Sequence, residues 1–173
     1  MNASVRIAVR ARHGFNLLEV VISTLLVSVV LLGATNMMAG VVRGRGVAND
    51  RARADMMVEQ MLDEILALPF HDPENAASDN DYLGPETSEY VGNRSGYDDV
   101  DDYNGWRKNP PESKAGQPYE DLKGWTRRVV VEHVKASEPS TVSTTRTGAK
   151  RIHVSIDDGA HTLAEAWSLR TQW

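Results

Sequence analysis

The chain has 173 residues and no cysteine, which excludes disulfides, thiolate metal sites and cysteine nucleophiles. Its formal charge is −5 at pH 7, and this acidic balance argues against nucleic acid as a partner. The length suits one modest domain that follows a membrane helix.

The first predicted element is a membrane-spanning helix over residues 17–42. At 1.5 Å per residue it reaches roughly 39 Å, enough to cross a bilayer core of about 30 Å. Arg6, Arg10 and Arg12 precede it. The positive-inside rule therefore predicts a cytoplasmic N-terminus and places the rest of the chain outside.

A short motif marks the start of this helix: Gly14, Phe15, Leu17, Leu18 and Glu19. A carboxylate inside a membrane helix costs about 2.5–3.5 kcal/mol at the helix centre and less near an end, so Glu19 needs a partner. The alternative is an ordinary signal peptide or signal anchor. A signal anchor has no need of Glu19, and residues 33–35 are only a weak match to a secretory cleavage site.

The basic leader, the Gly-Phe junction, the Leu-Leu-Glu sequence and the apolar run together resemble the N-terminal signature of type IV prepilins and type II secretion pseudopilins. The resemblance implies that a prepilin peptidase cuts after Gly14 and that Phe15 becomes the N-methylated first residue. It implies that Glu19 meets the N-terminal amine of a neighbouring subunit, with Leu17 and Leu18 as the apolar pair of the assembly segment.

The resemblance also implies a location and a set of partners. The chain would be a single-pass protein of the inner membrane, with its C-terminal domain in the periplasm. Its partners would be other pilin or pseudopilin subunits, the prepilin peptidase and an inner-membrane assembly platform. Asn16 departs from the family pattern, in which Thr or Ser is commoner. Removal of residues 1–14 takes away three arginines, which leaves a side-chain charge of about −8.

An amphipathic pattern continues the helix beyond the membrane segment. Apolar residues recur three or four apart between 47 and 68, and Pro69 ends the pattern. Gly40, Gly44 and Gly46 predict a bend or local unwinding between the two halves. We expect the apolar stripe to pack against a sheet, as an ordinary core helix does and as the pilin resemblance implies.

Residues 71–104 contain ten acidic side chains and a single basic one, Arg94. Clustered carboxylates suit Ca²⁺, a hard ion that takes six to eight oxygen ligands. The candidate ligands are Asp98, Asp99, Asp101 and Asp102. The spacing is not that of an EF-hand, and the alternative is a solvated acidic loop that Tyr103 and Trp106 anchor to the sheet. We predict no other cofactor.

The last third of the chain predicts an antiparallel sheet. Residues 125–135 form a β-branched run, and residues 150–171 read as a hairpin around an Asp-Asp-Gly turn. Ile152, Val154 and Ile156 alternate onto one face, and Leu163, Trp167 and Leu169 share a face of the partner strand. Residues 136–149 are predicted to be an exposed connection.

The predicted fold class is α+β, with a long N-terminal helix packed against a small C-terminal antiparallel sheet, a pilin-like layout. The predicted segments are a leader (1–14), a transmembrane and assembly helix (15–42), an amphipathic extension (43–69), an acidic loop-rich region (70–124) and the sheet (125–173).

Two functions from different classes remain. The first is a structural subunit of a type IV pilus or a type II secretion pseudopilus. Within that family, residues 56–66 resemble minor pseudopilins of the I and V types. Residues 98–105 resemble a stretch of minor pilins of the mannose-sensitive haemagglutinin (MSHA) type, so a minor subunit is favoured. The second is a membrane-anchored periplasmic binding or adaptor domain that does not polymerise. We predict no enzyme activity, because the five histidines are scattered and no nucleophile or phosphate-binding motif is present.

Overall fold

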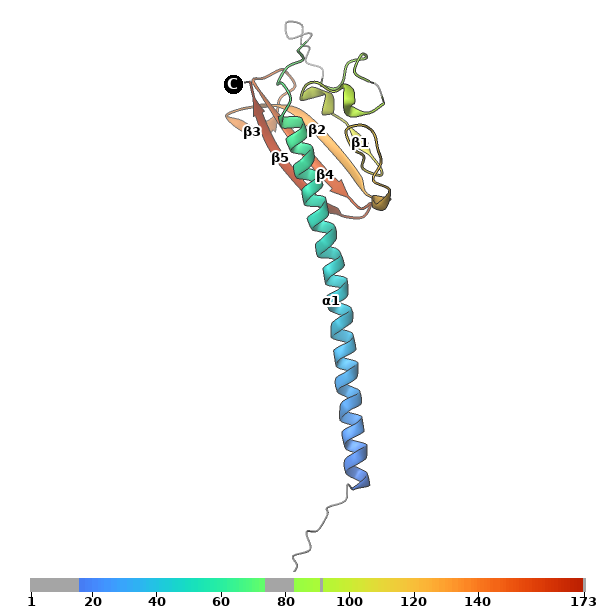
Figure 1. Cartoon of the computed structure of the whole chain (residues 1–173). Helices are drawn as coiled ribbons and strands as arrows, with labels where there is room; N and C mark the ends of the chain where they lie inside the picture. Colours follow the sequence, from blue (N-terminus) through green and yellow to red (C-terminus); the bar gives the residue numbers. More distant parts are fainter. Residues whose placement is uncertain (1–15, 74–82, 91, 173) are drawn as a thin grey trace, which may run out of the picture. The chain divides into compact units, whose positions relative to one another are not determined.

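The structure is a computed structural model that describes residues 16–73, 83–90 and 92–172. It begins with helix α1 (Leu17–Leu66) and continues with three short 3-10 turns and five strands (Figure 1). The turns are η1 (Arg94–Gly96), η2 (Asp101–Tyr103) and η3 (Glu120–Leu122). The strands are β1 (Arg107–Lys108), β2 (Thr126–Lys135), β3 (Glu138–Val142), β4 (Ala149–Asp157) and β5 (Thr162–Thr171).

The chain forms two compact units that meet between Gly46 and Val47. The described part of the first unit is the N-terminal stretch of α1, and the second unit contains the rest of α1 and the sheet. Residues 40–46 are helical throughout. The predicted local unwinding at Gly40, Gly44 and Gly46 is therefore wrong. Each glycine costs about 1 kcal/mol relative to alanine in a helix, which weakens the helix without forbidding it.

The sheet is antiparallel, and its strand order is β1-β2-β4-β5, with β3 paired to the end of β2. Strands β2 and β4 pair in register from Thr126↔Asp157 to His133↔Lys150. Strands β4 and β5 form the predicted hairpin. A long N-terminal helix packed against a small antiparallel sheet confirms the predicted α+β class.

Strand β3 is a correction to the predicted exposed connection at 136–149. It follows β2 after a two-residue turn, and Lys135 pairs with Glu138. All five residues of β3 are exposed. Because neither face of this strand is buried, its sequence shows no alternation of apolar and polar residues.

The core lies between the C-terminal half of α1 and one face of the sheet. The helix contributes a stripe spaced three or four apart, as predicted: Ala54, Val58, Met61 and Ile65. The sheet contributes the fully buried side chains of Val129, Val131, Ile152, Val154 and Ile156. Burial of each Val or Ile side chain contributes about 1.5–3 kcal/mol, so this interface accounts for much of the stability of the second unit.

The opposite face of the sheet is exposed. Trp167 and Leu169 lie on it, with 53% and 41% of their surface accessible, whereas Ala164 of the same strand faces the core. The His153 ring stacks on Trp167 with centroids 3.6 Å apart, and its Nε2 lies 3.0 Å from a carboxylate oxygen of Glu165. Cross-strand pairs of this kind stabilise a sheet surface.

Candidate functional site

The first turn of α1 is organised by Asn16. The backbone N–H groups of Glu19 and Val20 donate to the Asn16 carbonyl oxygen at 2.9 and 3.2 Å. The Leu18 N–H donates to the Asn16 side-chain oxygen at 3.4 Å. Asn16 thus caps the helix, and Glu19 lies in the first turn, where the helix dipole favours a negative charge.

The apolar surface of α1 is exposed over its whole N-terminal part. Leu17 and Leu18 are 80% and 62% accessible, and the apolar side chains that follow, as far as Val42, are all exposed. Within the part of the chain that the structure describes, α1 is the one helix long and apolar enough to cross a membrane. This is consistent with a single-pass membrane protein.

Glu19 makes no ion pair with any basic side chain in the described residues. The predicted processing residues, Gly14 and Phe15, lie outside the described residues. The predicted assembly residues Leu17, Leu18 and Glu19 lie together in the exposed first turn of α1. Cleavage between Gly14 and Phe15 stays a prediction.

Three of the four aspartates predicted as calcium ligands accept hydrogen bonds or form an ion pair within the fold. An Asp99 oxygen accepts from the N–H groups of Asp101 and Asp102 at 2.7 and 3.3 Å. The Oδ2 atom of Asp102 accepts from the N–H groups of Asp98 and Asp99 at 2.8 and 3.1 Å. Asp101 forms a buried ion pair with Lys150 of β4. Asp99, Asp101 and Asp102 are thus engaged in closing the turn and tying it to the sheet.

This turn is part of the core rather than a solvated loop. Tyr103 and Val100 are fully buried, and Trp106 is nearly so. The Lys150 ammonium donates to the Phe70 carbonyl oxygen at 2.5 Å in addition to pairing with Asp101. Burial, followed by the negative charges of Asp101 and Asp102, raises the pKa of Asp99 to about 8. The predicted anchoring by Tyr103 and Trp106 is confirmed, whereas the expected solvation of the loop is wrong.

One of the four aspartates joins a different acidic cluster. Asp102 lies beside Glu86 and Glu89, and one carboxylate oxygen of each residue lies within 4.8 Å of the others. Burial, followed by the carboxylates of Glu86 and Asp102, raises the pKa of Glu89 to about 9. Sequence reasoning missed Glu86 and Glu89 as partners of Asp102, because 13 residues separate Glu89 from Asp102 and no local pattern links them.

A buried ion pair joins η1 to α1. The fully buried Arg94 guanidinium donates to both carboxylate oxygens of Glu64, at 3.0 and 3.3 Å. The Tyr103 hydroxyl donates to Glu64 at 2.8 Å, and the Arg94 guanidinium carbon lies 4.2 Å from the centroid of the Trp106 ring. Burial would raise the pKa of Glu64, but the hydrogen bonds from Arg94 and Tyr103 outweigh it and the pKa is lowered.

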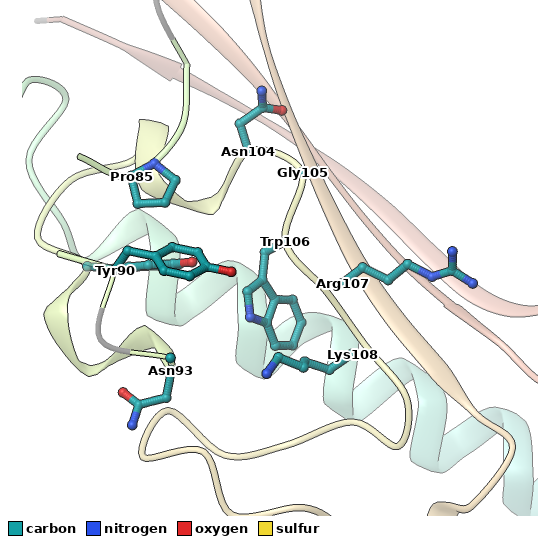
Figure 2. Close-up of a pocket in the computed structure, with 10 residues that line it drawn as sticks. Pro85, Tyr90, Asn93, Asn104, Gly105, Trp106, Arg107 and Lys108 are labelled. Carbon is teal, nitrogen blue, oxygen red and sulfur yellow. The ribbon is translucent and has the colours of Figure 1, made fainter. Parts of the chain in front are cut away.

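A small pocket lies between Pro85, Tyr90 and Asn93 on one side and β1 on the other (Figure 2). Its volume is about 210 Å³, and Tyr90, Asn104 and Trp106 are among the residues that line it. Small-molecule sites are typically about 300–1,000 Å³. We assign no ligand to this pocket.

Comparisons with known proteins give no match: no family model, curated protein or solved structure is similar to this chain at a significant level.

Proposed function

We propose that this chain is a minor pilin or minor pseudopilin, a structural subunit of a type IV pilus or a type II secretion pseudopilus. In this proposal a prepilin peptidase removes residues 1–14, and the membrane helix holds the mature subunit in the inner membrane until assembly. The observation that carries the proposal is the exposed apolar surface of α1 with one carboxylate, Glu19, in its first turn. The proposal also rests on the sequence signature around Gly14 and Phe15.

The proposed mechanism is packing of the apolar helix against the same helix of neighbouring subunits. Glu19 would be neutralised by the protonated N-terminal amine of a neighbour. In a low-dielectric environment such a pair attracts strongly, whereas an unpaired carboxylate is penalised. The free-energy difference between paired and unpaired Glu19 would therefore set the position of each subunit relative to its neighbour along the fibre.

The second unit supports this role because it needs nothing from the membrane helix to form its core. Among the residues that the structure describes, every buried residue of the core lies at or after Ala54. A subunit built in this way can leave the membrane without repacking its globular part. No nucleotide-binding motif is visible in the sequence, so the energy for assembly must come from another protein.

The first test is the N-terminal residue and the mass of the protein extracted from membranes with and without the prepilin peptidase. We expect an N-methylated Phe15 that depends on the peptidase. An intact Met1, or a cut near Ala34, would contradict the proposal and favour a signal anchor or a secreted domain.

The second test is Glu19→Ala, which removes the carboxylate and keeps the helix. We expect membrane insertion and peptidase cleavage to be retained and incorporation into fibres to be lost. Glu59→Ala, an exposed acidic position on the same helix, is the matched control and should assemble normally. Normal assembly of Glu19→Ala would contradict the pairing mechanism. A chain that is cut but never enters a fibre would favour the membrane-anchored adaptor.

A further inference from the structure

Lys150 of β4 and Asp101 of η2 meet in the interior of the second unit. Their side chains are 1% and 7% exposed, and the Lys150 Nζ atom contacts the Asp101 Oδ1 atom. The two residues are 49 positions apart in the chain, so the contact ties the acidic loop region to the sheet. The cost of removing two charges from water can exceed the attraction between them, so a buried ion pair is not by itself a stable end point.

The surroundings hold the Lys150 nitrogen against the Asp101 carboxyl group. The Nζ atom donates to the Phe70 carbonyl oxygen at 2.5 Å and lies 4.3 Å from the centroid of the Phe70 ring. Both contacts fix the position of the nitrogen, and the ring keeps water from one side of it. Because Cγ of Asp101 is bonded to the contacted oxygen, the nitrogen also lies beside the carbon of the carboxyl group.

A third carboxyl group belongs to the same turn. An Asp99 oxygen accepts the Asp101 N–H at 2.7 Å, and only 3% of the Asp99 surface is accessible. A buried carboxyl group in this position can carry a proton between the Lys150 nitrogen and an oxygen that leaves Asp101. The turn thus brings an amine, a carboxyl group and a neighbouring acid together away from solvent.

We propose that Lys150 and Asp101 condense into an amide, an intramolecular isopeptide bond. The ammonium first gives a proton to the carboxylate, which leaves a neutral amine and a neutral acid. The lone pair of Nζ then forms a bond to Cγ, and the bond from Cγ to the protonated oxygen breaks. That oxygen takes a second proton from the nitrogen and leaves as water. The two charges disappear, and no oxidant or reductant is consumed.

Two effects favour the amide over the ion pair. Well-oriented groups within one molecule react at effective concentrations of about 10⁵–10⁸ M, which a free amine and a free acid never reach in solution. Condensation also removes two buried charges, which are poorly solvated where they lie. The same burial limits the access of water that would reverse the reaction. We therefore expect the bond to form once the chain has folded.

The bond would join η2 to β4 covalently. The chain has no cysteine, so a disulfide cannot do this. A cross-link between distant residues reduces the freedom of the unfolded chain, which stabilises the folded state in the way that a disulfide does. This proposal concerns the second unit alone and does not depend on the proposed assembly function.

The test is the mass of the full chain, produced without the prepilin peptidase, purified in detergent and then denatured. We expect a mass lower than the sequence mass by one water. After digestion with trypsin we expect a branched peptide that joins residues 95–107 to residues 147–151, because trypsin does not cut after a lysine whose amine is part of an amide.

Two variants separate the bond from the ion pair. Lys150→Arg keeps the positive charge but carries a guanidinium that does not condense with a carboxylate, and Asp101→Ala removes the carboxyl group. We expect both variants to have their full sequence mass. Lys123→Arg is the matched control, because Lys123 pairs with Glu120 at 2.9 Å and both side chains are exposed. This variant should still lose one water.

A wild-type chain that has its full sequence mass and is cut after Lys150 would overturn the proposal and leave only the ion pair. A loss of water that persists in Lys150→Arg would overturn it too. So would a loss that maps to the linear peptide containing Asp158 and Gly159, where a succinimide also forms with release of water. The wild-type mass and the branched peptide need no variant, so a variant that fails to fold does not affect them. Neither readout involves fibre assembly, so failure here is distinguishable from failure of the proposed function.

Discussion

Arg94 illustrates how single side chains hold the loop region to the helix. Its guanidinium is fully buried, and a carboxylate of α1, Glu64, neutralises it. A buried pair of this kind adds little net stability as a whole, but loss of one partner leaves an uncompensated charge. Loss of the Glu64 carboxylate should therefore destabilise the fold, although the Glu64 side chain is partly exposed.

Glu64→Gln tests this arrangement. We expect a loss of about 3 kcal/mol in the free energy of unfolding, because the buried Arg94 charge is left without a counter-ion. Glu59→Gln, an exposed position on the same helix, should change stability by less than about 0.5 kcal/mol. Chemical unfolding of the three proteins at neutral pH measures both differences. Equal stability of Glu64→Gln and the wild type would show that Arg94 finds another partner.

The same pair predicts a pH dependence. The pKa of Glu64 in the folded state lies below its ordinary value of 4.5, so the unfolded chain binds its proton more tightly. The stability from this group is therefore complete above pH 4.5 and is lost as the pH falls through the folded pKa. We expect Glu64→Gln to lose less stability than the wild type between about pH 5 and about pH 3. Parallel stability curves for the two proteins would contradict the lowered pKa.

At the scale of elements, one stripe of α1 carries the packing against the sheet. Met61 is fully buried in the core, whereas Met56, five residues earlier, is 61% accessible. The two methionines differ in orientation and not in chemistry. They form a matched pair with which to measure what the stripe contributes.

We expect Met61→Ala to lower the free energy of unfolding by about 2–5 kcal/mol, because it opens a cavity in the core. Met56→Ala should cost less than about 0.5 kcal/mol, because its side chain stays in contact with solvent. Thermal or chemical unfolding of the two variants measures the difference. Similar losses in both would mean that the stripe is not the packing face.

The sequence predicts best the helices and strands that bury one face, because their apolar residues recur at a regular spacing. The α1 stripe and the alternation at Ile152, Val154 and Ile156 both reflect one buried face, so pattern and structure agree. Strand β3 has no buried face, so nothing in its side chains distinguishes it from a loop. Its pairing comes from the turn that follows β2 and from backbone hydrogen bonds.

The loop region could be predicted only in part. Its aromatic anchors, Tyr103 and Trp106, were recognisable because large aromatic side chains are usually buried. The directions of the carboxylate side chains cannot be predicted from the sequence, because they depend on contacts between segments that are distant in the chain. Asp101 turns towards Lys150, and Asp102 faces Glu86 and Glu89, which the chain brings near only after folding. A count of acidic residues therefore identifies the segment but not which of its carboxylates come together in the fold.

At the scale of the whole molecule, the chain separates into an apolar helical unit and a globular unit, which meet between Gly46 and Val47. Among the described residues, the first exposes its large apolar side chains, and the second holds every residue of the buried core. The two units are continuous in sequence through α1. Removal of the helical unit should therefore change the solubility of the protein and leave the stability of the globular unit nearly unchanged.

This division predicts the behaviour of a truncated chain. A protein of residues 47–173 keeps all of the core and loses the apolar surface, so we expect a soluble protein that unfolds cooperatively without detergent. Its unfolding temperature should lie within a few degrees of the full chain in micelles. A protein of residues 60–173 also loses Ala54 and Val58, which are buried in the core, and should not fold. Size-exclusion chromatography and circular dichroism on both proteins provide the measurement. Aggregation of the longer protein, or cooperative unfolding of the shorter one, would show that the boundary of the folding unit lies elsewhere along α1.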